Sequence, residues 1–230
     1  MTYRHVKRKA AAKRPPWLLA AFIVSVLIAI AVVVRRTVAL ISPAAGNSAR
    51  GAAIDATFAA HKTLTLLHIL PAAAFVLVAA KLLLSKQQSL LLNRVFYALG
   101  AWTGLTAFAM NAYAIGGWTE RSAVFLFNTL FLTYLARACW LSQPTRGAEE
   151  HAWMLRAVGV LLGIATTRPV MGTFFATQSI THLRPEQFFG IAFWIGFSLN
   201  TIAVELWLRF GARRAAEVEA PMSSPKQPRS

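Results

Sequence analysis

Six long runs of the chain are almost free of charged residues, and short polar stretches with basic residues separate them. The runs cover residues 17–34, 63–80, 95–119, 122–142, 157–181 and 187–204. A helix rises about 1.5 Å per residue, so about 17–25 apolar residues cross a hydrocarbon core that is about 30 Å thick. The pattern predicts an all-α integral membrane bundle of six transmembrane helices.

The segments around these runs predict the organisation of the chain. They divide it into a basic N-terminal tail (1–16), a transmembrane helix (17–41), an external loop (42–56), a five-helix core (57–210) and a disordered tail (211–230). The first run follows a basic stretch, as in a signal peptide. It is longer than a typical signal-peptide core, and Arg35-Arg36 stands where cleavage would begin, so we expect an uncleaved signal anchor. Gly116-Gly117 predicts a tight turn.

Composition supports a membrane protein. Hydrophobic residues make up 57% of the 230 residues and charged residues only 14%, whereas soluble domains carry about 25% charged residues. The net charge is +16, but the basic residues lie in tails and short loops, as membrane topology requires. The charge therefore does not indicate a nucleic-acid partner. The single cysteine, Cys139, excludes an intramolecular disulfide.

The basic residues also predict the orientation, because they favour the cytoplasmic side of a membrane. If the N-terminus is cytoplasmic, 17 of the 24 lysines and arginines are cytoplasmic, six are external and Arg168 lies within the membrane. We therefore expect both termini to be cytoplasmic. The basic tails would contact anionic lipid, at about 1 kcal/mol per charge near the surface.

Arg168 is the sharpest candidate for a functional residue, because ionisable groups are costly inside a bilayer. It lies about 18 Å along its helix from Arg156 at the inner edge. The same arithmetic places His68, Asn111 and Asn128 with Arg168 at one level, about 9–16 Å below the external surface. No aspartate or glutamate shares that level, so the sequence offers Arg168 no counter-ion.

Two interpretations of this polar level stay open. In the first, the four side chains line a cavity for a ligand with a carbonyl, carboxylate or phosphate group, and Arg168 is the donor. In the second, Pro169 leaves the carbonyl of Ala165 unpaired and kinks the helix. Arg168 then bonds the freed carbonyls, and the asparagines join neighbouring helices.

A second group of polar residues lies near the inner ends of the runs. It comprises Arg137, His151, Arg156, Glu205 and Arg209. Glu205 and Arg209 are four residues apart, and therefore neighbours on one face of a helix. Ion pairs and side chains that reach the interface explain this cluster as structural.

The histidines invite a haem or metal hypothesis, because imidazole ligates both. His61 and His68 are seven residues apart, and therefore about 10 Å apart along one helix face. No second histidine matches the depth of His68, which disfavours a haem held by two histidines. His61 and His182 are both external. With Asp55 or Glu186 nearby, they could bind a divalent metal.

Motifs for an enzyme are missing from the sequence. It has no glycine-rich phosphate loop, no GxSxG, no HExxH and no pair of carboxylates within a run. A hydrolase or kinase is therefore not indicated, and a non-enzymatic protein is favoured.

Several short motifs, in this order, also resemble one protein family. They are His61, Asn93-Arg94-Val95-Phe96-Tyr97, Gly104-Leu105, Gly116-Gly117, His151-Ala152-Trp153-Met154-Leu155-Arg156, Thr167-Arg168-Pro169, Asn200 and Glu205. The stretch from Asp55 to Arg209 resembles the bacterial multi-pass membrane family described as domain of unknown function twenty-three-oh-six. Family members often have a His-Arg pair before the third helix, and this chain has no histidine there. The resemblance implies a bacterial membrane bundle and supplies no activity.

The hypothesis that follows is a non-enzymatic subunit or binding protein of the bacterial cytoplasmic (inner) membrane. It would hold a small apolar ligand, such as a quinone or lipid, near Arg168. The alternatives are a transporter of a small solute or proton, which usually needs a carboxylate deep in the membrane, and a haem-binding electron-transfer subunit. Membrane lipids, a partner subunit or a second copy of the chain are the expected partners.

Overall fold

The described residues, 16–42, 52–85, 89–142 and 146–219, form nine helices and no strand in this computed structural model. The helices are α1 (Pro16–Ile41), α2 (Ala52–Ala60), α3 (Lys62–Leu84), α4 (Leu90–Asn111), α5 (Gly117–Trp140), α6 (Gly147–Leu161), α7 (Gly163–Ala176), α8 (Gln178–Thr181) and α9 (Pro185–Glu219). The prediction of an all-α protein is confirmed.

Within the described residues, five helical segments are long and apolar enough to cross a membrane. They are α1, α3, α5, α6 together with α7, and α9 as far as Gly211. The helix α4 takes the place of the third predicted span and has 22 residues, but it is not among the five. The count of six therefore stays a prediction.

The third predicted span, 95–119, is wrong at its C-terminal end. The helix α4 ends at Asn111, and α5 begins at Gly117. Gly117 has a φ of 59°, a left-handed conformation that glycine adopts without steric cost. The turn that Gly116-Gly117 predicts is therefore present. It ends α4 at Asn111, whereas the charge pattern places the end of this span at residue 119.

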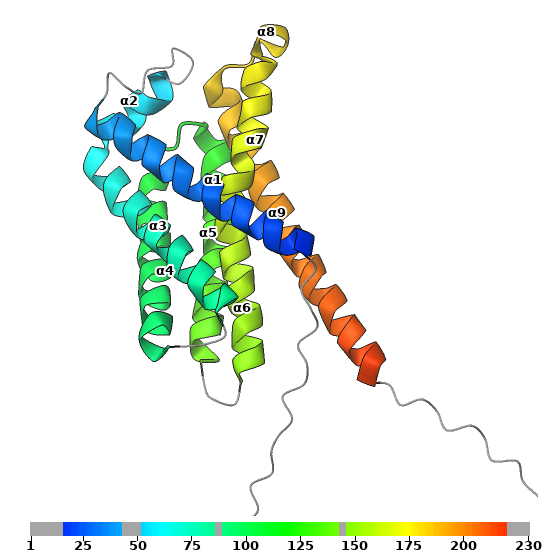
Figure 1. The fold of residues 1–230 in the computed structure, drawn as a ribbon. Coiled ribbons are helices and arrows are strands. Elements are labelled where there is room, and N and C mark those ends of the chain that lie inside the picture. Colours follow the sequence, from blue (N-terminus) through cyan, green and yellow to red (C-terminus); the bar gives the residue numbers. More distant parts are fainter. Residues whose placement is uncertain (1–15, 43–51, 86–88, 143–145, 220–230) are drawn as a thin grey trace, which may run out of the picture.

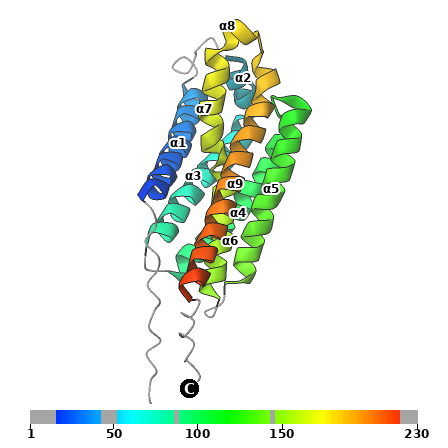
Figure 2. The ribbon, with the colours of Figure 1, turned by 90° about the vertical axis from the view of Figure 1, so that its right-hand side faces the viewer.

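The long helices run alternately up and down (Figure 1). Sequence neighbours α3, α4, α5 and α6 pack side by side, and α9 packs against α5, α6 and α7. The helix α1 crosses the bundle obliquely and contacts α3 and α7 (Figures 1 and 2). Only Ala29, Arg36 and Leu40 of α1 are buried, so most of this apolar helix faces outward.

Aromatic packing joins the first three helices of the core. Phe75 of α3 and Phe96 of α4 are fully buried, and their ring centroids are 4.7 Å apart. Phe131 of α5 meets Phe75 edge to face at 5.6 Å. Such pairs are each worth about 0.5–1.5 kcal/mol beyond the area they bury.

Three predicted features of the backbone differ from the structure. The fifth run is interrupted at Leu162, between α6 and α7, whereas Pro169 lies inside α7. The predicted tail begins at Gly211, but α9 continues to Glu219, because alanine, arginine and glutamate favour a helix. Of the predicted external loop 42–56, residues 52–56 belong to α2. Parts of three predicted segments lie outside the described residues. They are residues 1–15 of the N-terminal tail, 43–51 of the external loop and 220–230 of the C-terminal tail.

Glycines bring α7 and α9 into close contact. A Cβ atom on Gly196 would lie 2.6 Å from Cγ2 and 2.7 Å from the backbone nitrogen of Thr167. A Cβ atom on Gly163 would lie 2.6 Å from the ring of Phe197. Small residues at such positions let helix backbones approach each other, which is a main source of association between membrane helices.

The substitution Gly196→Ala tests this packing. We expect it to destabilise the protein by about 1–3 kcal/mol, because the contact with the Thr167 backbone cannot be relieved by a side-chain rotation. The thermal unfolding midpoint of the purified protein should fall by several degrees. The control is Gly172→Ala on α7, where an added Cβ meets nothing within 4 Å. Equal midpoints for the two variants would contradict the close α7–α9 contact.

Candidate functional site

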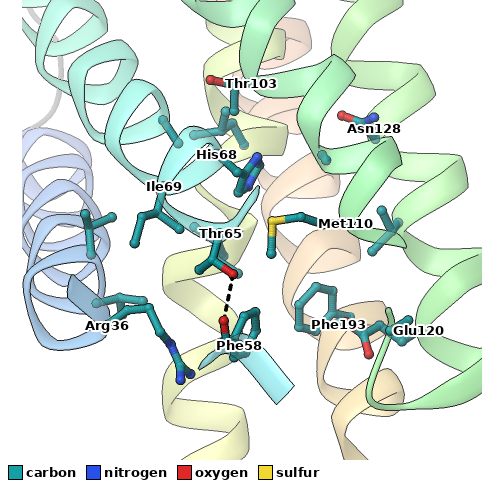
Figure 3. Close-up of a pocket in the computed structure, with 18 of the residues that line it drawn as sticks. Arg36, Phe58, Thr65, His68, Ile69, Thr103, Met110, Glu120, Asn128 and Phe193 are labelled. Atoms are coloured by element: carbon teal, nitrogen blue, oxygen red, sulfur yellow. Dashed lines mark hydrogen bonds between the residues drawn. The ribbon is translucent and has the colours of Figure 1, made fainter. Parts of the chain in front are cut away.

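A cavity of about 240 Å³ is lined by residues of α1 to α7 and of α9. Most of its wall is apolar. The polar residues that line it are Arg36, Thr57, His61, Thr65, His68, Thr103, Tyr113, Glu120, Asn128 and Arg168. Figure 3 shows Arg36 and Glu120 on opposite sides of this space, with His68 and Met110 between the helices. Ligand sites usually combine an apolar wall with a few polar groups in this way.

Arg168 of α7 is one of the residues that line the cavity. Its Nε is buried and has no hydrogen-bond partner among the described residues. Its Nη1 lies 3.9 Å from the sulfur of Met171, which is a weak acceptor. The charges that act on Arg168 are those of Arg36 and Arg35, and both are positive. In the described part of the chain no carboxylate forms an ion pair with Arg168.

Arg36 reaches the cavity from α1 and is paired. Its Nη1 donates to Oδ1 of Asp55 on α2, and the guanidinium lies over the ring of Phe58, 4.0 Å from the centroid. Arg35 contacts the other oxygen of Asp55 at 3.4 Å. The side chains of Arg36 and Asp55 are 10% and 13% exposed, whereas that of Arg35 is 55% exposed. The carboxylate of Asp55 thus pairs with both Arg35 and Arg36.

His68 and Asn128, two of the predicted residues, also line the cavity. Nδ1 of His68 lies 3.0 Å from the hydroxyl oxygen of Thr106 on α4. The side-chain amide of Asn128 donates to the carbonyl of Gly104 on α4 at 2.9 Å. Both residues therefore hold α4 against a neighbouring helix while they face the cavity.

Asn111, the fourth predicted residue, does not line the cavity. Its side-chain amide donates to the backbone carbonyl of Arg121 at 3.2 Å, across the turn between α4 and α5. Depth along a helix predicts the level of a side chain but not its direction, and Asn111 points to the turn.

The predicted metal pair lacks a third ligand. His61 stacks on Tyr113 with 3.5 Å between ring centroids, and both rings line the cavity. His182 ends α8 in a left-handed conformation, with a φ of 52°. Among the described residues, no three His, Cys, Asp or Glu side chains gather as a metal site would require. Asp55, one of the proposed helpers, is bonded to arginines instead.

Sequence reasoning missed Arg36, Tyr113 and Glu120. Arg36 follows the first apolar run and counts as an external charge in the sequence, yet it lies in α1 and lines the cavity. Glu120 is buried, and its Oε2 accepts a hydrogen bond from the backbone N–H of Gly116 at 2.7 Å. A helical projection of residues 17–41 would place Arg36 seven residues from Ala29, on the face that α1 buries.

Several residues of the predicted inner cluster are in contact. Arg156 donates to Glu205 at 2.8 Å, and Arg209 approaches the same carboxylate at 3.4 Å. Arg137 and Arg156 both lie over the ring of Trp153, at 6.0 and 4.6 Å from its centroid. His151, the remaining member, lies in the first half of α6.

The substitution Glu205→Gln tests the structural role of this cluster. It leaves Arg156 and Arg209 without their shared carboxylate, so we expect a loss of about 1 kcal/mol, which lowers the unfolding midpoint by about 2–4 °C. High salt should reduce the difference, because it screens exposed charges. The matched control is Glu149→Gln, since Glu149 is exposed on α6. A change no larger than that of the control would contradict the role.

Comparison with protein-family models, curated proteins and solved structures finds no match for this chain. The resemblance of Asp55–Arg209 to the family of unknown function stays a prediction.

Proposed function

We propose that this protein is a multi-pass protein of the bacterial cytoplasmic membrane that binds a small amphiphilic ligand in its cavity, without catalysing a reaction. The ligand is a lipid-like or quinone-like molecule with one polar head group beside Arg168. Five apolar helices support insertion in a membrane. We further propose that α4 is a sixth span, and that both termini are cytoplasmic, as the distribution of basic residues favours.

The unpaired side chain of Arg168 is the observation that carries this proposal. The polar contact of this guanidinium is a Met sulfur, and its buried Nε has no partner among the described residues. Burial of such a charge is costly, because hydrogen bonds do not offset the loss of its hydration. The structural interpretation of the sequence required Arg168 to bond carbonyls freed by a kink. In the described residues Arg168 makes no such bond, and the helix interruption lies at Leu162 instead. A ligand head group would supply the missing acceptor.

The cavity has a suitable size and chemistry. Its volume of about 240 Å³ corresponds to about eight water-sized groups of ~30 Å³ each. This is enough for a head group and a short apolar segment, and is below the ~300–1,000 Å³ of typical drug-sized sites. The ring of His61 is stacked on Tyr113, and His68 bonds Thr106, so both histidines have structural partners. These contacts favour a small amphiphile over a haem held by the two histidines.

Co-purification tests the proposed function. Mass spectrometry of the wild-type protein should detect a small amphiphile at about one molecule per chain, above the level of bulk lipid. In Arg168→Ala we expect its occupancy to fall by about tenfold or more, because a charge-assisted hydrogen bond is worth about 1.5–3 kcal/mol. The thermal unfolding midpoint of each preparation reports whether the protein is folded.

The matched control is Arg184→Ala. Arg184 precedes α9, is exposed and does not line the cavity, so this variant should keep the ligand. An unchanged occupancy in folded Arg168→Ala would refute the site, and a wild-type protein that carries only bulk lipid would refute the binding function.

A further inference from the structure

The α2 end of the cavity has an excess of positive charge. The positive charges of Arg35 and Arg36 act on Arg168 there. The carboxylate of Asp55 pairs with Arg35 and with Arg36. Arg35 is more than half exposed, so water and salt screen its charge. Inside the wall, Arg36 and Asp55 balance each other. One uncompensated charge remains, and it belongs to Arg168.

Glu120 does not balance this charge. It lines the cavity from α5, but its carboxylate accepts the N–H of Gly116 at 2.7 Å. It forms no ion pair with either arginine of the wall in the described residues. Figure 3 shows Glu120 across the cavity from Arg36, on the far side of Phe193. The negative group that Arg168 lacks therefore has to come from outside the described chain.

Arg36 is placed to bind the same negative group. Its side chain lines the cavity and extends toward Phe58 (Figure 3). A guanidinium has five N–H donors, and the bond to Asp55 is made by Nη1, so donors remain for a second acceptor. The Cζ atom of Arg36 lies 4.0 Å from the centroid of the Phe58 ring, and this contact restrains the guanidinium. A fixed planar fork suits a carboxylate.

We infer that the ligand of the cavity is a single-chain amphiphile with a carboxylate head group, bound between Arg168 and Arg36. This inference rests on the proposed function and names the class of its ligand. A carboxylate carries the one negative charge that compensates Arg168. A neutral carbonyl leaves the buried charge uncompensated, and a phosphate monoester carries about −1.5 to −2 charges at pH 7, more than the wall can balance. The apolar chain lies among side chains such as Ile69, Phe131 and Phe193.

Equilibrium binding to the full-length protein in phosphatidylcholine nanodiscs tests the inference. The probe is radiolabelled decanoate, with decanol and decyl phosphate as competitors, and empty nanodiscs correct for partition into lipid. We expect decanoate to bind saturably and about tenfold or more tightly than decanol, since a charge-assisted hydrogen bond replaces a neutral one. Decyl phosphate should compete less well than decanoate. If it competes better, the head group is a phosphate and the assignment to a carboxylate is wrong.

Two variants assign the arginines. In Arg168→Gln the preference for decanoate over decanol should disappear, whereas the affinity for decanol changes less than about twofold. The double variant Arg36→Gln with Asp55→Asn removes both partners of the ion pair, so that no buried charge is left without a partner. Its affinity for decanoate should fall about three- to tenfold. Arg184→Gln is the matched control and should behave as wild type. Thermal unfolding midpoints establish that each variant is folded. The comparison of the three ligands on the wild-type protein tests the inference even if a variant does not fold.

The outcomes separate the two proposals. If decanoate and decanol bind equally, the binding function stands and the carboxylate inference is wrong. If neither binds saturably, the carboxylate inference is wrong, and the co-purification experiment decides separately whether the binding function stands. A preference for decanoate that survives Arg168→Gln overturns the role of Arg168, and unchanged decanoate affinity in the double variant overturns that of Arg36.

Discussion

A polar group within the apolar interior of a membrane protein has to find its partner inside the protein, because lipid offers none. Most of this bundle follows that constraint. Thr106 and Thr133 return their hydroxyls to carbonyls of the preceding turn, at 2.8 Å each. Asn200 of α9 accepts from Thr166 at 2.7 Å and donates to the carbonyl of Gly159 at 3.2 Å. These bonds join α9 to α6 and α7, where glycines already bring the backbones together.

The constraint also explains the contrast between the two charge clusters. At the inner cluster, Glu205 lies between Arg156 and Arg209, and Trp153 supplies an aromatic face for Arg156. At the cavity, Asp55 pairs with Arg35 and Arg36, whereas the one polar contact of Arg168 among the described residues is Nη1 with the sulfur of Met171. The first cluster is complete as it stands. In the second, Nε of Arg168 has no acceptor among the described residues, and Arg168 lines the cavity.

Charge spacing along the chain predicts much of this architecture. The gaps between charged residues locate the long helices, because a charge in the middle of a span is costly whatever the fold. Gly116-Gly117 marks a turn by the conformational freedom of glycine. Helical rise alone places His68, Asn128 and Arg168 at one depth, and all three line the cavity. These features depend on local geometry, which sequence carries directly.

The remaining features depend on direction and on distant contacts. Asn111 has the right depth but bonds Arg121 across a turn, and the stacking of His61 on Tyr113 joins residues from two helix ends. The ion pair of Arg36 with Asp55 links α1 to α2 across residues 43–51, which lie outside the described part of the chain. A helical projection places Arg36 on the buried face of α1, but no periodicity relates Arg36 to Asp55, so the sequence alone could not reveal this ion pair.

The position of α1 follows from the same pair. This helix is the most apolar of the five candidate spans and has the smallest share of buried residues, so lateral packing alone holds it weakly against α3 and α7. Its buried polar contact is Arg36 with Asp55 and Phe58 of α2. A ligand carboxylate that also bonds Arg36 would therefore act on the same contact that fixes α1. Binding of such a ligand would in this way couple occupation of the cavity to the position of the first helix through the guanidinium of Arg36.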